Sequence, residues 1–237
     1  MGNLLIVESK NDKIFIEKLI QVMNLSNVTV DEPICIDDYN CLSGLNKKKL
    51  IEAFEDLLDE LSTQATRKQA IGKVGVIIDI DKNTEQERLD FVNSCIDEVF
   101  QRSVPLGKVN ELIDVTTSNN ISLQLGCYFM NVDGQGELET LLKAIKAWES
   151  PHADCLYDWR KCLEGKGESI LDKNFDKFWL DTYIRLDTCS KKERTQADRK
   201  CSMRAFDYIL EQKSDIFKWD DRILEDLKSF LKLFAEN

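Results

Sequence analysis

The sequence predicts an α/β protein with a mostly parallel sheet flanked by helices and a helical extension toward the C-terminus. Strand-like and helix-like stretches alternate through the first half of the chain, as in a doubly wound α/β core. The run Val74–Ile78 is hydrophobic on both faces, as expected for a strand of a covered parallel sheet. After about Leu142 the alternation stops, and aromatic residues such as Trp148 and Trp179 occur in short helical segments.

Each element rests on the spacing of its apolar residues. The short apolar run Leu4–Val7 predicts a strand, and the helical spacing of apolar residues between Asp12 and Met23 predicts the helix after it. The same reasoning gives, in chain order, strand Val28–Ile36, helix Lys47–Leu61, strand Val74–Ile78, helix Glu85–Phe100, strand Leu123–Met130 and a final helix from about Ile223 to Phe234. We therefore expect a core over residues 1–145 and a helical extension or cap over 146–237, with its independence as a domain left open.

Composition limits the class of protein. With 237 residues, 43% hydrophobic and 32% charged, the chain is typical of a soluble globular protein of one domain, or of one domain with a subdomain. Its apolar runs are shorter than the roughly 18 residues of a membrane span, and its start does not resemble a secretory signal, so we expect no membrane association and a cytoplasmic location. The net charge of −11 argues against broad attraction to nucleic acid, so any such binding requires a local basic patch.

The eight cysteines do not indicate a metal site. They form no C-x-x-C pair, and the chain has a single histidine, His152, so a structural zinc site is not expected. In a cytoplasmic chain the expectation is reduced thiols, several packed as small hydrophobes. A thiol nucleophile made of Cys189 and His152 is also not expected, because no matching motif surrounds either residue.

Three carboxylates fall at the carboxyl ends of predicted strands, where open α/β sheets bind their ligands. Glu8 follows the first strand, and Asp79 and Asp81 follow the third, so the three converge if those strands are neighbours. Concentrated negative charge favours a cation, and hard oxygen ligands favour Mg²⁺ or Mn²⁺ over Zn²⁺. The alternative is that Asp79 and Asp81 only cap the following turn or helix.

The motifs around these acids resemble those of Toprim domains of the OLD-like (overcoming lysogenisation defect) nuclease branch. The resemblance rests on residues 6–16 (IVESKNDKIFI), on 75–81 (GVIIDID) and on the G-x-L-E segment at 136–139, and it covers about residues 4–145. It implies that Glu8 acts in acid/base chemistry or binds metal, and that Asp79 and Asp81 bind metal. It further implies additional acids at Asp12 and Glu139, holding one or two Mg²⁺ or Mn²⁺ ions that serve phosphodiester hydrolysis.

Two of these residues have structural alternatives. Asp12 also suits the first turn of a helix, where its charge stabilises the helix dipole. Glu139 is also consistent with the surface of a helix from Leu138 to Trp148.

A basic stretch between Arg185 and Arg204 is the best candidate for contact with phosphates in this acidic chain. Its candidate nucleic-acid-binding residues are Lys191, Lys192, Arg194, Arg199, Lys200 and Arg204. The resemblance implies a late lysine that stabilises transition-state charge; Lys200 is our choice, with Lys192 nearly equal. The alternative for each residue is a solvated charged loop.

Three functions remain open at this stage. The first is a metal-dependent nuclease acting on DNA or RNA. The second is a non-catalytic binding or regulatory module. The resemblance implies a homodimer, and it implies anti-phage defence with an ABC-type ATPase partner. That ATPase acts in trans, since the chain has no P-loop of its own. The third is a phosphatase of the haloacid dehalogenase type, which also uses D-x-D after a buried strand. It is disfavoured because Thr84 lies one position too late and the catalytic strand of that family is usually N-terminal.

Overall fold

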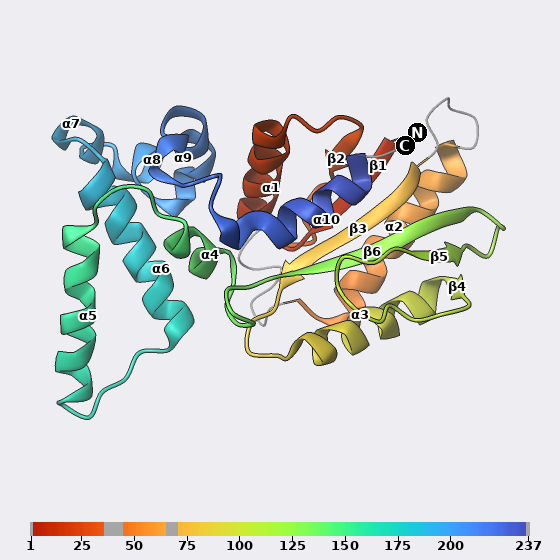
Figure 1. Ribbon diagram of the computed structural model, residues 1–237, viewed down its shortest axis with the longest axis horizontal. Helices are drawn as coiled ribbons and strands as arrows, with labels where there is room; N and C mark the ends of the chain where they lie inside the picture. The colour runs from red at the N-terminus through yellow and green to blue at the C-terminus, as the bar shows by residue number, and fades with distance from the viewer. Residues whose placement is uncertain (1, 36–44, 65–70, 236–237) are drawn as a thin grey trace. The chain divides into compact units, whose positions relative to one another are not determined.

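The computed structural model describes residues 2–35, 45–64 and 71–235. The chain divides into two compact units (Figure 1). The first unit contains Met1–Met130 together with Leu224–Asn237, and the second contains Asn131–Ile223. The division therefore differs from the boundary expected at residue 145, and the C-terminal segment belongs to the first unit. The physical reason is that the last helix packs on the sheet of the first unit.

Within the described residues, six strands form one sheet in the order β2-β1-β3-β6-β5-β4. The strands are β1 (Gly2–Val7), β2 (Val28–Val30), β3 (Ile71–Asp79), β4 (Gln101–Arg102), β5 (Ile113–Thr116) and β6 (Ser122–Met130). The pairs β1–β2, β1–β3 and β3–β6 are parallel, while β5 and β4 add an antiparallel edge. The mostly parallel α/β sheet predicted from the sequence is thus confirmed.

Helices cover both faces of this sheet (Figure 1). They are α1 (Lys10–Met23), α2 (Lys47–Gln64), α3 (Glu85–Val99) and α10 (Glu225–Ala235). One hydrophobic cluster joins α2 and α3 to alternate residues of the strands. It includes Phe54 of α2, Val76 of β3 and Val92 of α3. The opposite face carries α10, whose Phe230 ring lies 5.7 Å from the ring of Tyr128 on β6. The burial of β3 on both faces follows from this arrangement.

Gly75 allows α10 to approach the middle of the sheet. A Cβ atom at this position would lie 2.6 Å from Leu5 Cδ2 and 2.7 Å from Phe234 Cζ, which no side chain tolerates without a shift. Glycine therefore makes room for the Phe234 ring against β3.

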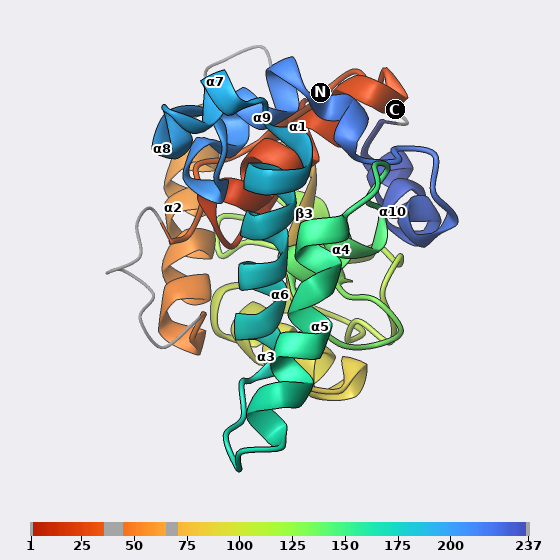
Figure 2. The same ribbon diagram turned by 90° about the vertical axis from the view of Figure 1, so that its left-hand side faces the viewer.

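The second unit is helical in its regular elements. They are α4 (Leu138–Ala144), α5 (Pro151–Glu164), α6 (Asp172–Thr182), a π-helical turn (Tyr183–Thr188), α7 (Lys191–Arg194), α8 (Ala197–Lys200) and α9 (Phe206–Gln212), with 3₁₀ turns at Met203–Ala205, Ser214–Ile216 and Arg222–Leu224, the last leading into α10. Helix α6 contacts both α4 and α5 (Figure 2). The helix expected from Leu138 to Trp148 ends at Ala144, because the Ala147 amide donates to the Ile216 carbonyl at 2.8 Å instead of continuing the helix.

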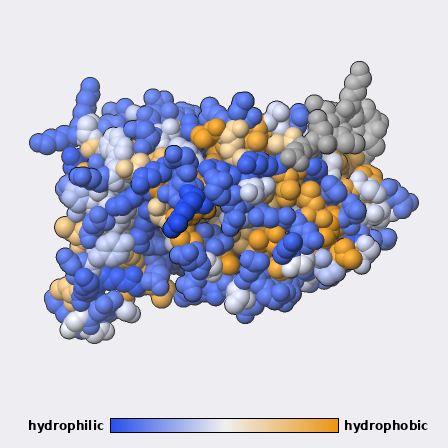
Figure 3. Space-filling view, viewed as in Figure 1, coloured by the Kyte–Doolittle hydropathy of each residue, from blue (hydrophilic) through white to orange (hydrophobic). Residues whose placement is uncertain are grey.

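The tryptophans differ in their environments. Trp179 is 1% exposed and stacks on Tyr183, with ring centroids 5.4 Å apart, so it belongs to the core of the second unit. Trp148 and Trp159 are exposed. In Figure 3 the face in view is mostly hydrophilic, and hydrophobic residues gather mainly over the sheet-bearing unit. No helix in the described ranges combines the length and apolar character of a membrane span.

Two expectations about local structure need correction. The strand expected over Val28–Ile36 ends at Val30, and Ile36 lies outside the described residues. The cysteines were expected to be reduced thiols, yet Cys189 and Cys201 form a disulfide. Their Cα atoms lie 6.2 Å apart at the two ends of a loop, a separation that permits the bond. By contrast, Cys95 and Cys127 are free and buried, as small hydrophobic residues are.

Candidate metal centre

Glu8 stands directly after β1, where the chain leaves the sheet. The backbone is fixed there because the Glu8 carbonyl accepts the Cys35 amide at 2.8 Å. The side chain of Glu8 is half-buried, and one carboxylate oxygen accepts the Asp79 amide at 3.4 Å. The carboxylate therefore points along the carboxyl edge of the sheet toward the end of β3.

Asp79 and Asp81 lie at the end of the neighbouring strand. Strands β1 and β3 are parallel and aligned with Val7 opposite Ile77, so their carboxyl ends meet at the same edge. The strand order places β2 on one side of β1 and β3 on the other, which makes the gap between β1 and β3 a topological switch point. Crevices at such points are where α/β proteins bind ligands.

Asp81 does not continue the strand geometry. Its φ of 56° lies in the left-handed region, where aspartate is among the few tolerated residues, and the chain turns there toward α3. Its carboxylate receives a 2.6 Å hydrogen bond from Arg88 Nη2. The turn therefore aims Asp81 at the first turns of α3.

Arg88 is the functional candidate that sequence reasoning missed. It lies on the buried face of α3 and is only 7% exposed, which is rare for an arginine without a partner. Its Nε also donates to the Ile80 carbonyl at 3.4 Å. The signal was readable, because helical spacing aligns Arg88 with the apolar Val92 and Ile96 on one stripe. A charged residue on such a stripe predicts a buried acid.

The pKa of the Glu8 carboxyl reflects its burial first and the neighbouring acid Asp81 second. Burial raises the pKa of the Glu8 carboxyl above its usual value, and the charge of Asp81 raises it further. The Asp79 amide, the Arg88 guanidinium and the Leu45 amide oppose this shift without cancelling it. Burial thus disfavours the charged form of Glu8, and a cation bound beside it would oppose that effect.

Asp12 has a structural role in the helix cap. Ser9 is the N-cap of α1, and Asp12 Oδ2 accepts the Ser9 amide at 2.8 Å while the Ser9 hydroxyl accepts the Asp12 amide at 3.3 Å. This reciprocal pair is a capping box. One oxygen of the buried Asp12 is thus used by the helix terminus, as the structural alternative predicted.

Glu139 belongs to the second unit, together with Glu137 and Lys177. Lys177 Nζ lies 3.4 Å from a Glu137 oxygen and 3.9 Å from a Glu139 oxygen. Burial raises the pKa of Glu139; Lys177 lowers it, and the charge of Glu137 raises it again. Both glutamates are therefore tied to a lysine of α6. Glu137, which is buried, was not singled out from the sequence.

The basic stretch forms a loop closed by the Cys189–Cys201 disulfide, which we call the basic loop, residues 189–201. Two short helices, α7 and α8, occupy it. The exposed cations of the loop are Lys191, Lys192 and Arg199, and Arg204, just after the loop, is exposed too. Arg194 and Lys200 are half-buried. The exposed members are available to solvent and to a polyanion.

Lys200 and Lys213 differ in how they are held. Lys200 Nζ lies 5.4 Å from the centroid of the Tyr208 ring. Lys213 reaches the other end of the loop, where its ammonium donates to the Thr188 carbonyl at 2.7 Å and lies 3.2 Å from Glu193. Lys213 thus supports the loop, and Lys200 packs its charge against an aromatic face.

The donors at the sheet edge suit a hard divalent cation in kind, because Glu8, Asp79 and Asp81 all offer carboxylate oxygens. In residues 2–35, 45–64 and 71–235, however, no three histidine, cysteine, aspartate or glutamate side chains are grouped as a ready metal site. The ion pair between Asp81 and Arg88 accounts for part of this, since it directs Asp81 toward α3. A cation at this edge competes with Arg88 for Asp81.

Fold and site together define a class: α/β proteins with acidic residues at the ends of the two strands that border the switch point of a mostly parallel sheet. The chain belongs to the family described as protein of unknown function (DUF3226), whose model matches residues 2–236. Neither a curated protein nor a solved structure matches it.

Proposed function

We propose that this protein is a divalent-metal-dependent nuclease that hydrolyses phosphodiester bonds of DNA or RNA. The observation that carries the proposal is the position of Glu8 beside the end of β3, with its carboxylate at the Asp79 amide and its pKa raised by burial and by Asp81. Crowded carboxylates at a switch point are the arrangement from which α/β enzymes build cation sites.

In this proposal Glu8, Asp79 and Asp81 hold one or two Mg²⁺ or Mn²⁺ ions. A bound ion of this type lowers the pKa of water and stabilises negative charge on phosphate oxygens. Arg88 holds Asp81 in the metal-free protein and keeps the edge folded against the repulsion of its acids. Glu139, which belongs to the second unit, stays a ligand predicted from the sequence alone. Asp12 fixes the start of α1 through its capping box.

The basic loop is the proposed contact with the nucleic-acid backbone. Its exposed Lys191, Lys192 and Arg199, with Arg204 after it, supply the local positive charge that an overall charge of −11 otherwise denies. Lys200 is the proposed catalytic lysine. Its half-buried place against Tyr208 supports a positioned charge rather than a solvated one.

The test is a cleavage assay on single- and double-stranded DNA and RNA, with Mg²⁺, with Mn²⁺ and with a chelator. The wild type should cleave at least one substrate only with metal, and Glu8→Gln and Asp79→Asn should reduce the rate about a hundredfold or more, as loss of a metal ligand or of acid/base chemistry does. Asp90→Asn, an exposed acid of α3, is the matched control and should keep full activity. Full activity in Glu8→Gln would refute the proposal.

The ion pair between Arg88 and Asp81 favours a second candidate, a non-catalytic module. If Arg88 never releases Asp81, the edge serves binding or regulation. The protein then acts in anti-phage defence through a partner, such as an ABC-type ATPase supplied in trans, or it acts as a homodimer. The neighbouring reading frame separates the two arrangements, because an ATPase encoded there favours the partnered form.

A cytoplasmic location is part of the same proposal. The Cys189–Cys201 bond opposes it, since disulfides are rare in reducing compartments. Counting the free thiols of protein purified from cells under alkylating conditions decides the matter.

A further inference from the structure

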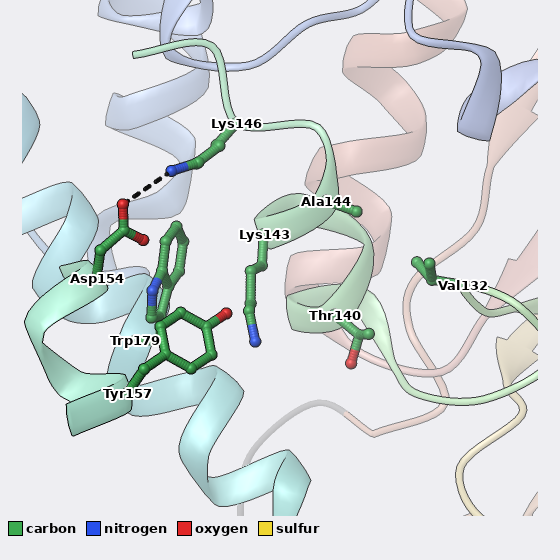
Figure 4. Close-up of a pocket in the computed structure, with 8 residues that line it drawn as sticks. All are labelled: Val132, Thr140, Lys143, Ala144, Lys146, Asp154, Tyr157 and Trp179. Atoms are coloured by element: carbon green, nitrogen blue, oxygen red, sulfur yellow. Dashed lines mark hydrogen bonds and ion pairs between the residues drawn. The ribbon is translucent and has the colours of Figure 1, made fainter. Parts of the chain in front are cut away.

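The second unit contains a pocket of about 400 Å³ whose lining includes none of the residues proposed for catalysis. Its volume lies within the range of small-molecule sites. Figure 4 shows Lys143 and Lys146 extending from α4 and the segment after it, beside Tyr157 of α5 and Trp179 of α6. The pocket is therefore built by three helices of one compact unit.

Aromatic rings form one wall of this pocket. Trp179 is buried, whereas Tyr157 is 40% exposed and accessible at the mouth. Lys143 Nζ lies 5.2 Å from the Tyr157 ring centroid and 5.8 Å from that of Trp179, while Lys146 Nζ lies 5.4 Å from Trp179. Two cations therefore stand at the faces of the rings that a flat ligand would contact.

The pocket offers more hydrogen-bond donors than acceptors. Lys143 donates to Asp176 at 2.6 Å. Lys146 donates to the Ser150 hydroxyl, and it also donates to Asp154 at a distance of 3.4 Å. Each ammonium has three protons, so these bonds leave donor capacity. The Trp179 Nε1–H is buried and has no hydrogen-bond partner among the described residues, although buried donors are normally paired. Asp154 is the carboxylate of the lining and pairs with Lys146, while Lys143 pairs with Asp176, which does not line the pocket.

We propose that this pocket binds a small anion carried on a flat aromatic ring, with the ring against Tyr157 and the anionic group at Lys146 and Lys143. Excess donors call for an acceptor-rich group, and the aromatic wall calls for a planar body. Nucleoside monophosphates and simple aromatic carboxylates share this chemistry. The proposal does not depend on the nuclease proposal, because the pocket contains none of Glu8, Asp79 and Asp81.

The first experiment is isothermal titration calorimetry of the full chain with AMP, GMP, CMP and UMP, with benzoate, and with two half-ligands, adenosine and inorganic phosphate. At least one ring-bearing anion should bind at a single site, about tenfold or more tighter than either half-ligand. The tighter of the two anion types identifies the source. Absence of binding by every ring-bearing anion, or equal binding of inorganic phosphate or of adenosine, overturns the proposal.

Variants then place the binding in this pocket. Lys146→Met should weaken the ligand about tenfold, and Tyr157→Leu should weaken it by a similar factor, with unchanged circular dichroism. Lys161→Met is the matched control. Lys161 is an exposed lysine of α5, the helix that carries Tyr157, and it lies outside the pocket. It should bind like the wild type. Unchanged affinity in both pocket variants, or an equal loss in Lys161→Met, overturns the assignment.

Discussion

The sheet edge of the first unit and two acids of the second unit differ in how their charge is compensated. In the second unit Asp176 and Glu193 each have a lysine close by, in the pairs Asp176–Lys143 at 2.6 Å and Glu193–Lys213 at 3.2 Å. At the sheet edge of the first unit, Glu8 and Asp81 lie near one another and share Arg88, and the pKa of Glu8 stays raised. Glu8 and Asp81 therefore share one cation, as Glu137 and Glu139 of the second unit share Lys177, whereas Asp176 and Glu193 each have a lysine of their own.

This difference separates acids that stabilise the fold from acids that are available for function. A buried acid matched by its own cation costs stability when its partner is removed. A buried acid that repels a neighbouring acid costs stability in the metal-free protein, and such a cost is typical of binding and catalytic sites. Acids that share one cation, at the sheet edge and at Glu137 and Glu139, are therefore the candidates for function.

Asp176→Ala should produce the largest loss of stability. Asp176 accepts from Lys143 and from the Thr140 hydroxyl at 2.8 Å, and its removal leaves a largely buried ammonium without its acid. We expect a loss of about 3 kcal/mol in the free energy of unfolding, measured by urea denaturation. Asp158→Ala, which breaks an exposed pair with Lys161, should change it by less than about 0.5 kcal/mol. Equal effects of the two variants would contradict the comparison.

Arg88→Met should give the next largest effect. The variant keeps much of the buried aliphatic volume and removes the cation shared by Glu8 and Asp81, so we expect a loss of about 2 kcal/mol without metal. Added Mn²⁺ should stabilise this variant more than the wild type, because the Arg88 guanidinium no longer competes with the cation for Asp81. Arg102→Met, which breaks a pair with the exposed Asp97, is the control and should not respond to Mn²⁺. A variant as stable as the wild type without metal would argue against the proposed role of Arg88.

The smallest effect is a pH dependence of opposite sign at Glu193 and at Glu8. Hydrogen bonds from the Ser190 amide and hydroxyl, with Lys213, lower the pKa of Glu193 to about 2, so its stabilisation is present above its unfolded value of 4.5 and is lost as the pH falls toward 2. Glu193→Gln should therefore cost about 1 kcal/mol at pH 7 and little near pH 2.

Glu8 is the opposite case, because its pKa is raised from 4.5 in the folded, metal-free protein. Its favourable contribution is present below 4.5 and is lost as the pH rises through the raised pKa. Glu8→Gln should therefore gain stability relative to the wild type between pH 4 and pH 7. Thermal unfolding of both variants from pH 2 to pH 7 provides the measurement, and parallel profiles would contradict the opposite signs predicted for Glu193 and Glu8.

Much of the fold was predictable because its parallel core has strong apolar periodicity. Strands β1, β3 and β6 and helices α1, α2 and α3 lie close to their expected ranges. Strands β4 and β5 were not expected because both are short. Gln101–Arg102 has two residues, and in the four residues of Ile113–Thr116 only Ile113 and Val115 alternate with polar positions. The stripe of α10 was visible, but a stripe does not say which surface it covers, so its return to the first sheet was not predicted.

The candidate site was predictable only as far as strand ends reveal it. The positions of Glu8 and Asp79 follow from two apolar runs, and their proximity follows from the neighbouring places of β1 and β3. The pairing of Asp81 with Arg88 depends on a left-handed residue and on the rotation of α3, neither of which periodicity determines. Asp12 had two predicted roles, as a metal ligand and as an acid in the first turn of a helix, because an aspartate just after a strand suits both. The structure shows it in a capping box.

The most direct test of the account is a calorimetric titration of Mn²⁺ and of Mg²⁺ into the metal-free protein. Because the claim is that Glu8, Asp79 and Asp81 form a cation-binding edge, the wild type should bind at least one of these cations saturably. Binding should be lost in the Asp79→Asn/Asp81→Asn double variant and kept in the control Asp90→Asn. A wild type that binds neither cation, or a double variant that binds as tightly as the wild type, would contradict the account.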